Sequence, residues 1–503
     1  MSLKYKAVLG AIWTISTSVG GRALGLIGTL LITRFLTPDE YGQVNTAWIF
    51  VASVGMFAAF GFGQYIVANP KEDDEVVFHA TVYNQLTTLI VLLPLPWIAP
   101  LFQSSFPAFD QFFGYIPLLT VAAIVDHTGH IPSRVLARDM RFNVLGIRVL
   151  VSEVVYTATA LSLAAMDFGG WALAYALLVR TAVSSAIMIA AIKPAQWLKV
   201  GRLTRAITKR MLTFSLPMGG SNILHWYSAK ADNLIIAAVF GPATVGQYNL
   251  AYNLADIPTA HVGEHIGDVL LPSLANLDGP DRHRALVRAA GLMALLVFPL
   301  AVGLGAISET LVHALFDERW YAMAPMLTLL SALSVFRPIG WLIASYLQAE
   351  QRTRSLLLLE LLKTGGICGF VYFLGKLDIL WACVGVGAAF ALNAWASIAM
   401  VKQDGISMWR LTKPMLQPLL ATAPMVAVVL GVRALLAPTG LSPWLLVVLE
   451  LLAGALGYAG AAFVVAPGHA RDFIGLLVGV VRRRRGGTSD PPPSDDLDPP
   501  EED

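Results

Sequence analysis

The sequence predicts an all-α polytopic membrane protein with about fourteen transmembrane helices, each of which needs roughly 20 mostly apolar residues. Composition is the first observation behind this prediction. Of the 503 residues, 56% are hydrophobic and only 14% are charged, whereas soluble proteins average about 45–50% apolar and about 25% charged residues. The second observation is that long apolar runs follow one another with short polar gaps, which leaves no room for a large catalytic domain outside the membrane.

Hydropathy divides the chain into spans separated by short turns. In order, the expected spans are residues 7–35, 41–67, 79–102, 112–136, 143–166, 170–192, 211–239, 245–274, 286–315, 321–349, 355–375, 377–401, 415–437 and 443–466. The first run follows Lys4 and Lys6 and is too long for the apolar region of a cleavable signal peptide, so it counts as a span.

Positive charges orient these spans. With a cytoplasmic N-terminus, the outside loops contain only Arg34, Arg319, Lys376 and Arg433, while the other loop and helix-end cations fall inside. The positive-inside rule therefore predicts that both termini are cytoplasmic and that the number of spans is even. The acidic loop 71–75 also falls inside, but acidic residues contribute little to this rule.

Two stretches of the chain repeat each other. Residues 30–47 read LLITRFLTPDEYGQVNTA and residues 234–251 read LIIAAVFGPATVGQYNLA, a shift of 204 positions. The residues that recur identically are Leu30, Ile32, Pro38, Gly42, Gln43, Asn45 and Ala47. Each Pro and Gly is expected to end one helix and allow a tight turn at the outer surface. A weaker match pairs Leu136 and Arg141 with Leu347 and Arg352.

The repeat predicts two six-helix bundles that start on the same side and are related by a pseudo-two-fold axis along the membrane normal. The expected division is an N-terminal half at 1–200, a second half at 201–405, two additional transmembrane helices at 406–480, and a basic run with a disordered acidic tail at 481–503. Two such bundles enclose a central cavity, and rocking them produces alternating access. A static pore is the alternative, but no segment resembles a selectivity filter.

The strings TRFLTPDEYGQVNTA and AVFGPATVGQYNLAYNLADIP resemble the first- and seventh-helix signatures of polysaccharide repeat-unit flippases of the Wzx type. These flippases belong to the MOP superfamily, together with MATE exporters and the lipid II flippase. The resemblance implies a MATE-like fold and transport, without covalent chemistry, of undecaprenyl-pyrophosphate-linked oligosaccharide across the bacterial inner membrane. It implies membrane lipids as partners, with the polymerase and chain-length regulator of an exopolysaccharide, O-antigen or lipopolysaccharide pathway, and no nucleic acid.

Cations inside the spans are the first candidate site. An ionisable residue inside the bilayer usually faces a cavity or a partner. Four such residues are Arg22, Arg180, Lys230 and Arg337. In a wet cavity they could replace the hydration of a pyrophosphate, since arginine binds phosphate oxygens in a bidentate manner. The alternative is that each cation pairs with a carboxylate, as Lys363 is expected to do with Glu360 at i, i+3.

The eighth span carries a polar row, and the fourth carries a similar pair. The candidates for ion coupling or glycan contact are Asp126, His127, Asp256, His261, Glu264, His265 and Asp268. A relay for H⁺ or Na⁺, hydrogen bonding to sugar hydroxyls, and a wet cytoplasmic helix end with satisfied polar groups all fit this row. Beyond a coupling ion, no metal or other cofactor is expected.

Two other functions remain open alternatives. A MATE-type exporter of small cationic compounds would need an acidic pocket, whereas the four intramembrane cations indicate a basic one, and a lipid II flippase shares the lipid carrier. An integral-membrane polymerase or ligase would need a sizeable periplasmic loop to meet its acceptor. The longest loop, residues 193–210, is short, basic and expected inside.

Overall fold

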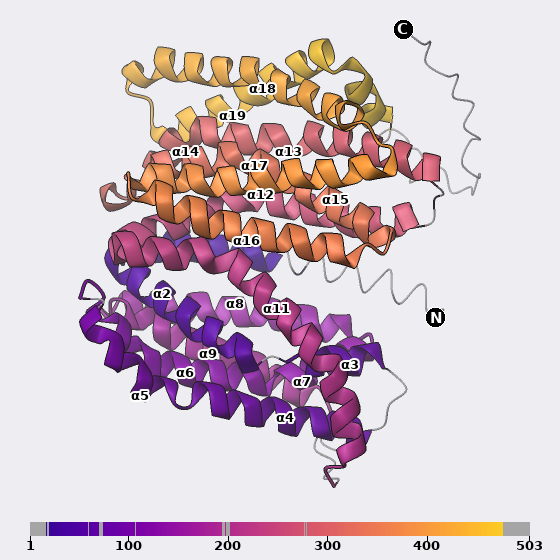
Figure 1. Ribbon diagram of the computed structural model, residues 1–503. Coiled ribbons are helices and arrows are strands. Elements are labelled where there is room, and N and C mark those ends of the chain that lie inside the picture. Colours follow the sequence, from indigo (N-terminus) through magenta and orange to yellow (C-terminus); the bar gives the residue numbers. More distant parts are fainter. Residues whose placement is uncertain are drawn as a thin grey trace.

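The computed structural model describes residues 17, 20–58, 60–69, 74–105, 107–193, 197, 202–275, 277 and 279–475, without the side chains of 260–269 and a few other helical positions. Within these ranges the regular elements are all helical (Figure 1). This arrangement agrees with the all-α class that the apolar runs predict.

The first half begins with a helix at Gly20–Ile32. It continues with α2 (Pro38–Gly55), η1 (Met56–Ala58), α3 (Phe62–Ala68), α4 (Asp74–Leu92), α5 (Leu95–Ile98), η2 (Ala99–Ser105), α6 (Phe112–Thr128), α7 (His130–Arg138), α8 (Phe142–Ala164) and α9 (Trp171–Ala190). The second half contains α11 (Arg205–Phe240), α12 (Pro242–Ala275), α13 (Gly279–Leu315), η3 (Glu318–Trp320), α14 (Met323–Leu333), η4 (Ser334–Phe336), α15 (Arg337–Ala349), α16 (Thr353–Gly375), α17 (Ile379–Val401) and η5 (Lys402–Asp404). The chain then adds α18 (Met408–Leu436), η6 (Ala437–Thr439) and α19 (Pro443–Val465).

Ten helices of the described chain are long and apolar enough to cross a membrane, and counting the bent pair α2–α3 makes eleven. The expected number of about fourteen therefore stays a prediction. The long helices α11 and α12 are not among the ten. Both carry charged and amide side chains along their length, which lowers their hydropathy and suits helices that face the protein interior.

Figure 1 shows two bundles side by side, with α2–α9 in one and α12–α17 in the other, and with the α18–α19 hairpin packed on the outer side of α13. Helix α11 runs obliquely along the boundary. Its first part packs against the N-terminal bundle, where the Tyr65 and Phe214 rings lie 5.4 Å apart and Tyr83 meets Thr208 at 3.0 Å. Its last part packs along α16.

The two bundles share a turn that the weaker repeat marks. Met140 and Gln351 both adopt left-handed conformations, with φ of 54° and 56°. The next residue in each case donates its N–H back to the helix, from Arg141 to Leu136 O and from Arg352 to Leu347 O, both at 2.9 Å. This bond is typical of a Schellman helix end, so the matched Leu and Arg residues mark the same structural turn in each half.

The stronger repeat has a different role from the expected one. Pro38 and Pro242 begin α2 and α12, as suits the first helical position. The glycines do not form the turn, which corrects the prediction: Gly42 and Gly246 lie inside the two helices, where α2 and α12 cross. A Cβ on Gly42 would overlap the carbonyl of Pro242, so glycine is present for space.

The repeated glutamines each fix a turn at the end of the molecule where α2 and α12 cross. The Gln43 amide donates to Asp110 at 2.7 Å and accepts from the Phe112 N–H at 3.0 Å, at the start of α6. The Gln247 amide donates to the carbonyl of Arg319 at 3.2 Å, just before α14. In both halves this residue fixes the turn that precedes the fourth span.

A buried ion pair fastens the extra hairpin to the second half. Glu450 in α19 is 0% exposed. It accepts from Arg433 Nε at 2.9 Å and from the Thr310 hydroxyl of α13 at 2.8 Å. Arg433, which the sequence placed in an outside loop, lies instead in the last turn of α18, and it also binds Glu309 at 3.1 Å.

Replacing Arg433 by Leu should lower the free energy of unfolding by about 3–5 kcal/mol, because it leaves the Glu450 carboxylate buried without its partner. Chemical denaturation of the purified protein in detergent measures this change. Glu309→Gln is the matched control, since the Glu309 side chain is 66% exposed and should contribute under about 1 kcal/mol. Equal, small changes in the free energy of unfolding for the two substitutions would contradict a stabilising role of the Arg433–Glu450 ion pair.

Candidate functional site

A polar cavity of about 250 Å³ lies between the N-terminal bundle and α11, the first helix of the second half. One wall is formed by Met56 of η1 and by α3, α4 and α7, and the other by α11; the polar lining residues are Gln64, Asn84, His130, Arg134, Asn222, His225 and Trp226. Met56 follows Gly42 by 14 residues along this helical stretch, so at 1.5 Å per residue the cavity lies about 20 Å from the crossing of α2 with α12. The two halves thus meet closely at the crossing, and the polar space lies toward the other end.

The local sequence explains how Arg134 reaches this cavity. The fourth span has a break at Gly129, and α7 continues it with His130 and Arg134 one turn apart. Gly63 lies against the Arg134 side chain, where a Cβ would crowd it. Within the described part of the chain, Arg134 forms no ion pair or side-chain hydrogen bond, so its guanidinium remains available to a ligand.

The α11 wall presents Asn222, His225 and Trp226 on one face, as the i, i+3 and i+4 spacing requires. Trp226 Nε1 donates to Ser53 Oγ at 3.1 Å, which joins this wall to α2. His225 lies 3.7 Å from Glu360 of α16, and Glu360 also pairs with Lys363 at 2.9 Å. The i, i+3 pairing predicted for Lys363 is confirmed.

None of the four predicted cavity cations is among the residues that line this cavity. Arg180 pairs with Glu153 at 3.0 Å and lies over the Tyr156 ring, so the pairing alternative holds for it. Lys230 is half-buried in α11 and forms no ion pair within the described residues. Arg22 is exposed on the first helix, whose Gly21 and Gly25 face α8.

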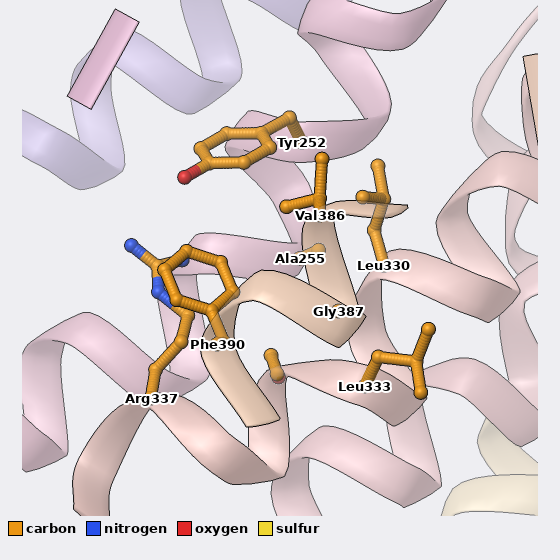
Figure 2. A pocket seen from close by; sticks show the side chains of 9 residues that line it. Tyr252, Ala255, Leu330, Leu333, Arg337, Val386, Gly387 and Phe390 are labelled. Carbon is orange, nitrogen blue, oxygen red and sulfur yellow. The ribbon is translucent and has the colours of Figure 1, made fainter. Parts of the chain in front are cut away.

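Arg337 lies in a closed pocket of the second half (Figure 2). It forms an ion pair with Asp256, and its guanidinium lies 5.0 Å from the Phe390 ring centre and 5.5 Å from that of Tyr252. The remaining space is about 10 Å³, about one water molecule. The pocket is too small for a pyrophosphate in this conformation, in which Arg337 follows the pairing alternative; its role as a cavity cation stays a prediction.

The polar candidates of the fourth and eighth spans do not form one site. His127 is buried and connects α6 to α4: its Nδ1 lies 3.0 Å from the Thr88 hydroxyl, and its carbonyl accepts a hydrogen bond from Asn84 at 3.1 Å. Asp126 is exposed, and Asp256 pairs with Arg337. The remaining predicted side chains lie outside the described part of the structure: His261, Glu264, His265 and Asp268.

Sequence reasoning missed a buried polar network between α11 and α12. The Asp232 carboxylate, 2% exposed, accepts from the Tyr248 hydroxyl at 2.6 Å and from Asn233 at 3.1 Å. Asn249, a residue of the repeat, donates to Asn233 at 2.6 Å. No Lys, Arg or His of the described chain forms an ion pair with Asp232. Adjacent Asp and Asn in an apolar run were the available signal.

Two bundles of apolar helices define a multi-pass α-helical membrane protein, and the solved structures agree on the fold. The lipid II flippase MurJ in an inward closed conformation superposes with a TM-score of 0.70 at 15% identity, covering 93% of this chain and 100% of that one. An inward-facing MATE family multidrug transporter of the MOP superfamily gives 0.60 at 17% identity, with 78% and 95% covered.

The sequence comparisons are more specific. The family profile described as "Polysaccharide biosynthesis protein" matches residues 31–325, so the chain belongs to this family. It is 24% identical to the lipopolysaccharide biosynthesis protein WzxC of Escherichia coli (strain K12), over 70% of this chain and 72% of that protein. It is 25% identical to the succinoglycan biosynthesis transport protein ExoT of Rhizobium meliloti (strain 1021), over 74% and 76%. The protein is therefore a multi-pass membrane protein of a polysaccharide biosynthesis family.

Asp256→Ala should lower the free energy of unfolding by about 2–3 kcal/mol, because it leaves the enclosed Arg337 guanidinium without a carboxylate. The double variant Asp256→Leu/Arg337→Leu should recover most of that loss, since no unpaired charge remains. Denaturant unfolding of the three proteins in detergent makes the comparison. If the single variant were as stable as the parent, the aromatic rings alone would hold Arg337 and the ion pair would be incidental.

Proposed function

We propose that the protein is a flippase that moves undecaprenyl-pyrophosphate-linked oligosaccharide repeat units across the bacterial inner membrane by alternating access. Both termini are then cytoplasmic, and the protein makes and breaks no covalent bond. The observation that carries the proposal is the polar cavity between the N-terminal bundle and α11, with Arg134 in its wall and without an ion pair among the described residues. The relatives named for lipopolysaccharide and succinoglycan biosynthesis support the choice of substrate.

The lining chemistry fits a phosphorylated sugar headgroup. A guanidinium offers a planar fork of donors to phosphate oxygens. The side-chain amides of Asn84 and Asn222 can exchange hydrogen bonds with hydroxyls, and the indole of Trp226 offers an apolar face with an N–H at its edge. Such a wall replaces the hydration that a pyrophosphate would lose in hydrocarbon.

The proposed binding site for the lipid part of the substrate is a separate apolar groove. A groove of about 750 Å³ runs between the first helix, α12, α13 and the α18–α19 hairpin. Apart from Glu450 and the Tyr458 hydroxyl, its lining is apolar or glycine, with Leu26, Pro299 and Met425 as examples. An isoprenoid chain in this groove would stay out of water while the headgroup occupies the polar cavity.

The charge of the cavity separates this proposal from the alternatives. An exporter of small cations would need carboxylates in the cavity, whereas its ionisable lining residues are His130, Arg134 and His225. A lipid II flippase remains chemically close, since it carries the same kind of phosphorylated lipid. In this pathway the polymerase and the chain-length regulator would receive the transported units.

For ion coupling we propose Asp232 as the residue that takes up H⁺ or Na⁺. This carboxylate is 2% exposed and forms no ion pair with a Lys, Arg or His of the described chain, so a bound cation would compensate its charge. Tyr248 of α12 and Asn233 of α11 donate to it, and Asn249 of α12 donates to Asn233, so both helices hold it. Because α11 also forms one wall of the cavity, a change at Asp232 can reach the substrate site.

Arg134→Ala should reduce transport of a fluorescent lipid-linked oligosaccharide in proteoliposomes by about 10–100-fold, as expected for the loss of a charge-assisted hydrogen bond. Arg134→Lys should retain part of the rate, since it keeps the charge but loses the fork. Arg138→Ala is the control, because Arg138 lies one turn away and pairs with Asp139 at 3.0 Å. Lipid II as a competing substrate tests the nearest alternative. Unchanged transport by Arg134→Ala would refute the proposed headgroup site.

Asp232→Asn should abolish the dependence of transport on imposed H⁺ or Na⁺ gradients, because the amide cannot bind a proton or neutralise a cation. Initial rates in proteoliposomes with each gradient, in turn and absent, measure this dependence. Asp126→Asn, at an exposed carboxylate, should keep it. Wild-type transport that does not change with either gradient would refute the coupling proposal, and it would not bear on the proposed headgroup site.

A further inference from the structure

The crossing of α2 and α12 is made by reciprocal backbone contacts. A Cβ on Gly42 would overlap the Pro242 carbonyl, and a Cβ on Gly246 would overlap the Pro38 carbonyl. Both glycines are in helical segments, and neither has a positive φ, so the backbone conformation does not require glycine there. Side chains can rotate away from a new methyl group, whereas the carbonyls of two helix starts cannot. Any side chain at these positions must therefore push the two helices apart.

A latch from the second half closes the same end. Trp320, which is fully buried, donates its indole N–H to the Thr33 carbonyl at 3.0 Å. Arg319 donates to the Arg34 carbonyl, also at 3.0 Å. These two carbonyls follow the first helix, at a helix end where main-chain acceptors lack helical partners. Tyr41 of α2 meets the edge of the Trp320 ring at 5.7 Å, so the latch also touches the crossing.

The contacts join the two halves and involve no ion pair between them at this end within the described residues. The glycine contacts link the second helix of one bundle to the second helix of the other. The latch links η3 of the second half to the turn after the first helix. The two halves are held at this end by close backbone packing and two hydrogen bonds to carbonyls. These contacts can break and re-form without leaving an unpaired charge in the bilayer.

We propose that this crossing and its latch are the outer gate of the transport cycle, and that Gly42 and Gly246 set the balance between its closed and open states. This inference rests on the alternating access of the proposed function. The gate is closed in this structure, and the polar cavity lies toward the opposite end. A methyl group at either glycine shifts the population toward a state in which the outer ends part and the opposite ends approach.

Paired spin labels can measure both ends of the molecule. Met166 and Leu377 are 65% and 68% exposed and lie in turns at the gate end of opposite halves, beside Gly169, which meets Glu40, and Gly375, which meets Phe240. At the other end, Asp139 is exposed in the turn after α7 and Arg354 is exposed in the first turn of α16. Cysteines at each pair, in a Cys368→Ala/Cys383→Ala background, carry the labels for pulsed dipolar spectroscopy in liposomes.

In Gly42→Ala and in Gly246→Ala we expect a longer 166–377 distance and a shorter 139–354 distance in most molecules. Gly55→Ala is the matched control in the same helix, because its Cβ would meet its neighbours at an ordinary 3.6 Å. Trp320→Phe keeps the ring but removes the N–H, and should populate the same long distance in part. It carries the test if the glycine variants fail to accumulate.

Distances that match those of Gly55→Ala in the glycine variants and in Trp320→Phe would overturn the gate. A longer 166–377 distance without any change at 139–354 would also overturn it, since that is local splaying and not exchange between two access states. These distances need no substrate. A gate that responds as expected in a protein that moves no lipid-linked oligosaccharide would therefore refute the proposed cargo and leave the gate standing.

Discussion

An ionisable side chain in a bilayer must be paired, hydrated or bound to a ligand, and this constraint organises the whole molecule. Arg180, Arg337 and Arg433 meet it within one half, through carboxylates on neighbouring helices. Their pairs fix α9 to α8, α15 to α12, and α18 to α19. Arg134 meets it differently: its partner is a polar cavity between the halves. The same rule thus separates the cations that hold the fold from Arg134, which is available to a substrate.

The two halves start from related sequences and use them for different chemistry. In both, the repeated proline begins the second helix and the repeated glutamine fixes the turn before the fourth span. In the second half, the repeated Asn249 also reaches the buried Asp232 carboxylate through Asn233. The first half instead supplies His130 and Arg134 to the cavity. We infer a division in which the first half contacts the phosphorylated headgroup and the second half responds to the coupling ion.

Sequence reasoning reached the features that depend on local patterns. The all-α membrane class follows from composition and the Lys363–Glu360 pair from short spacing, and the resemblance of two short strings indicated the family. It could not find which cations are neutralised, because the partners come from other helices: Arg433 is held in part by Glu309, far earlier in the chain. It gave Arg134 no role in the site, because the residues that line the cavity beside it come from α3, α4 and α11. The role of Gly42 required the opposite helix to be in place.

The central claim is that the cavity between the halves holds the phosphorylated headgroup, and a structure of the protein with a lipid-linked oligosaccharide bound would test it most directly. The account predicts phosphate oxygens within hydrogen-bond distance of Arg134, sugar rings beside Trp226, and the isoprenoid chain in the groove against α18 and α19. A headgroup bound at Arg22 or Lys230, with Arg134 left facing solvent, would contradict it.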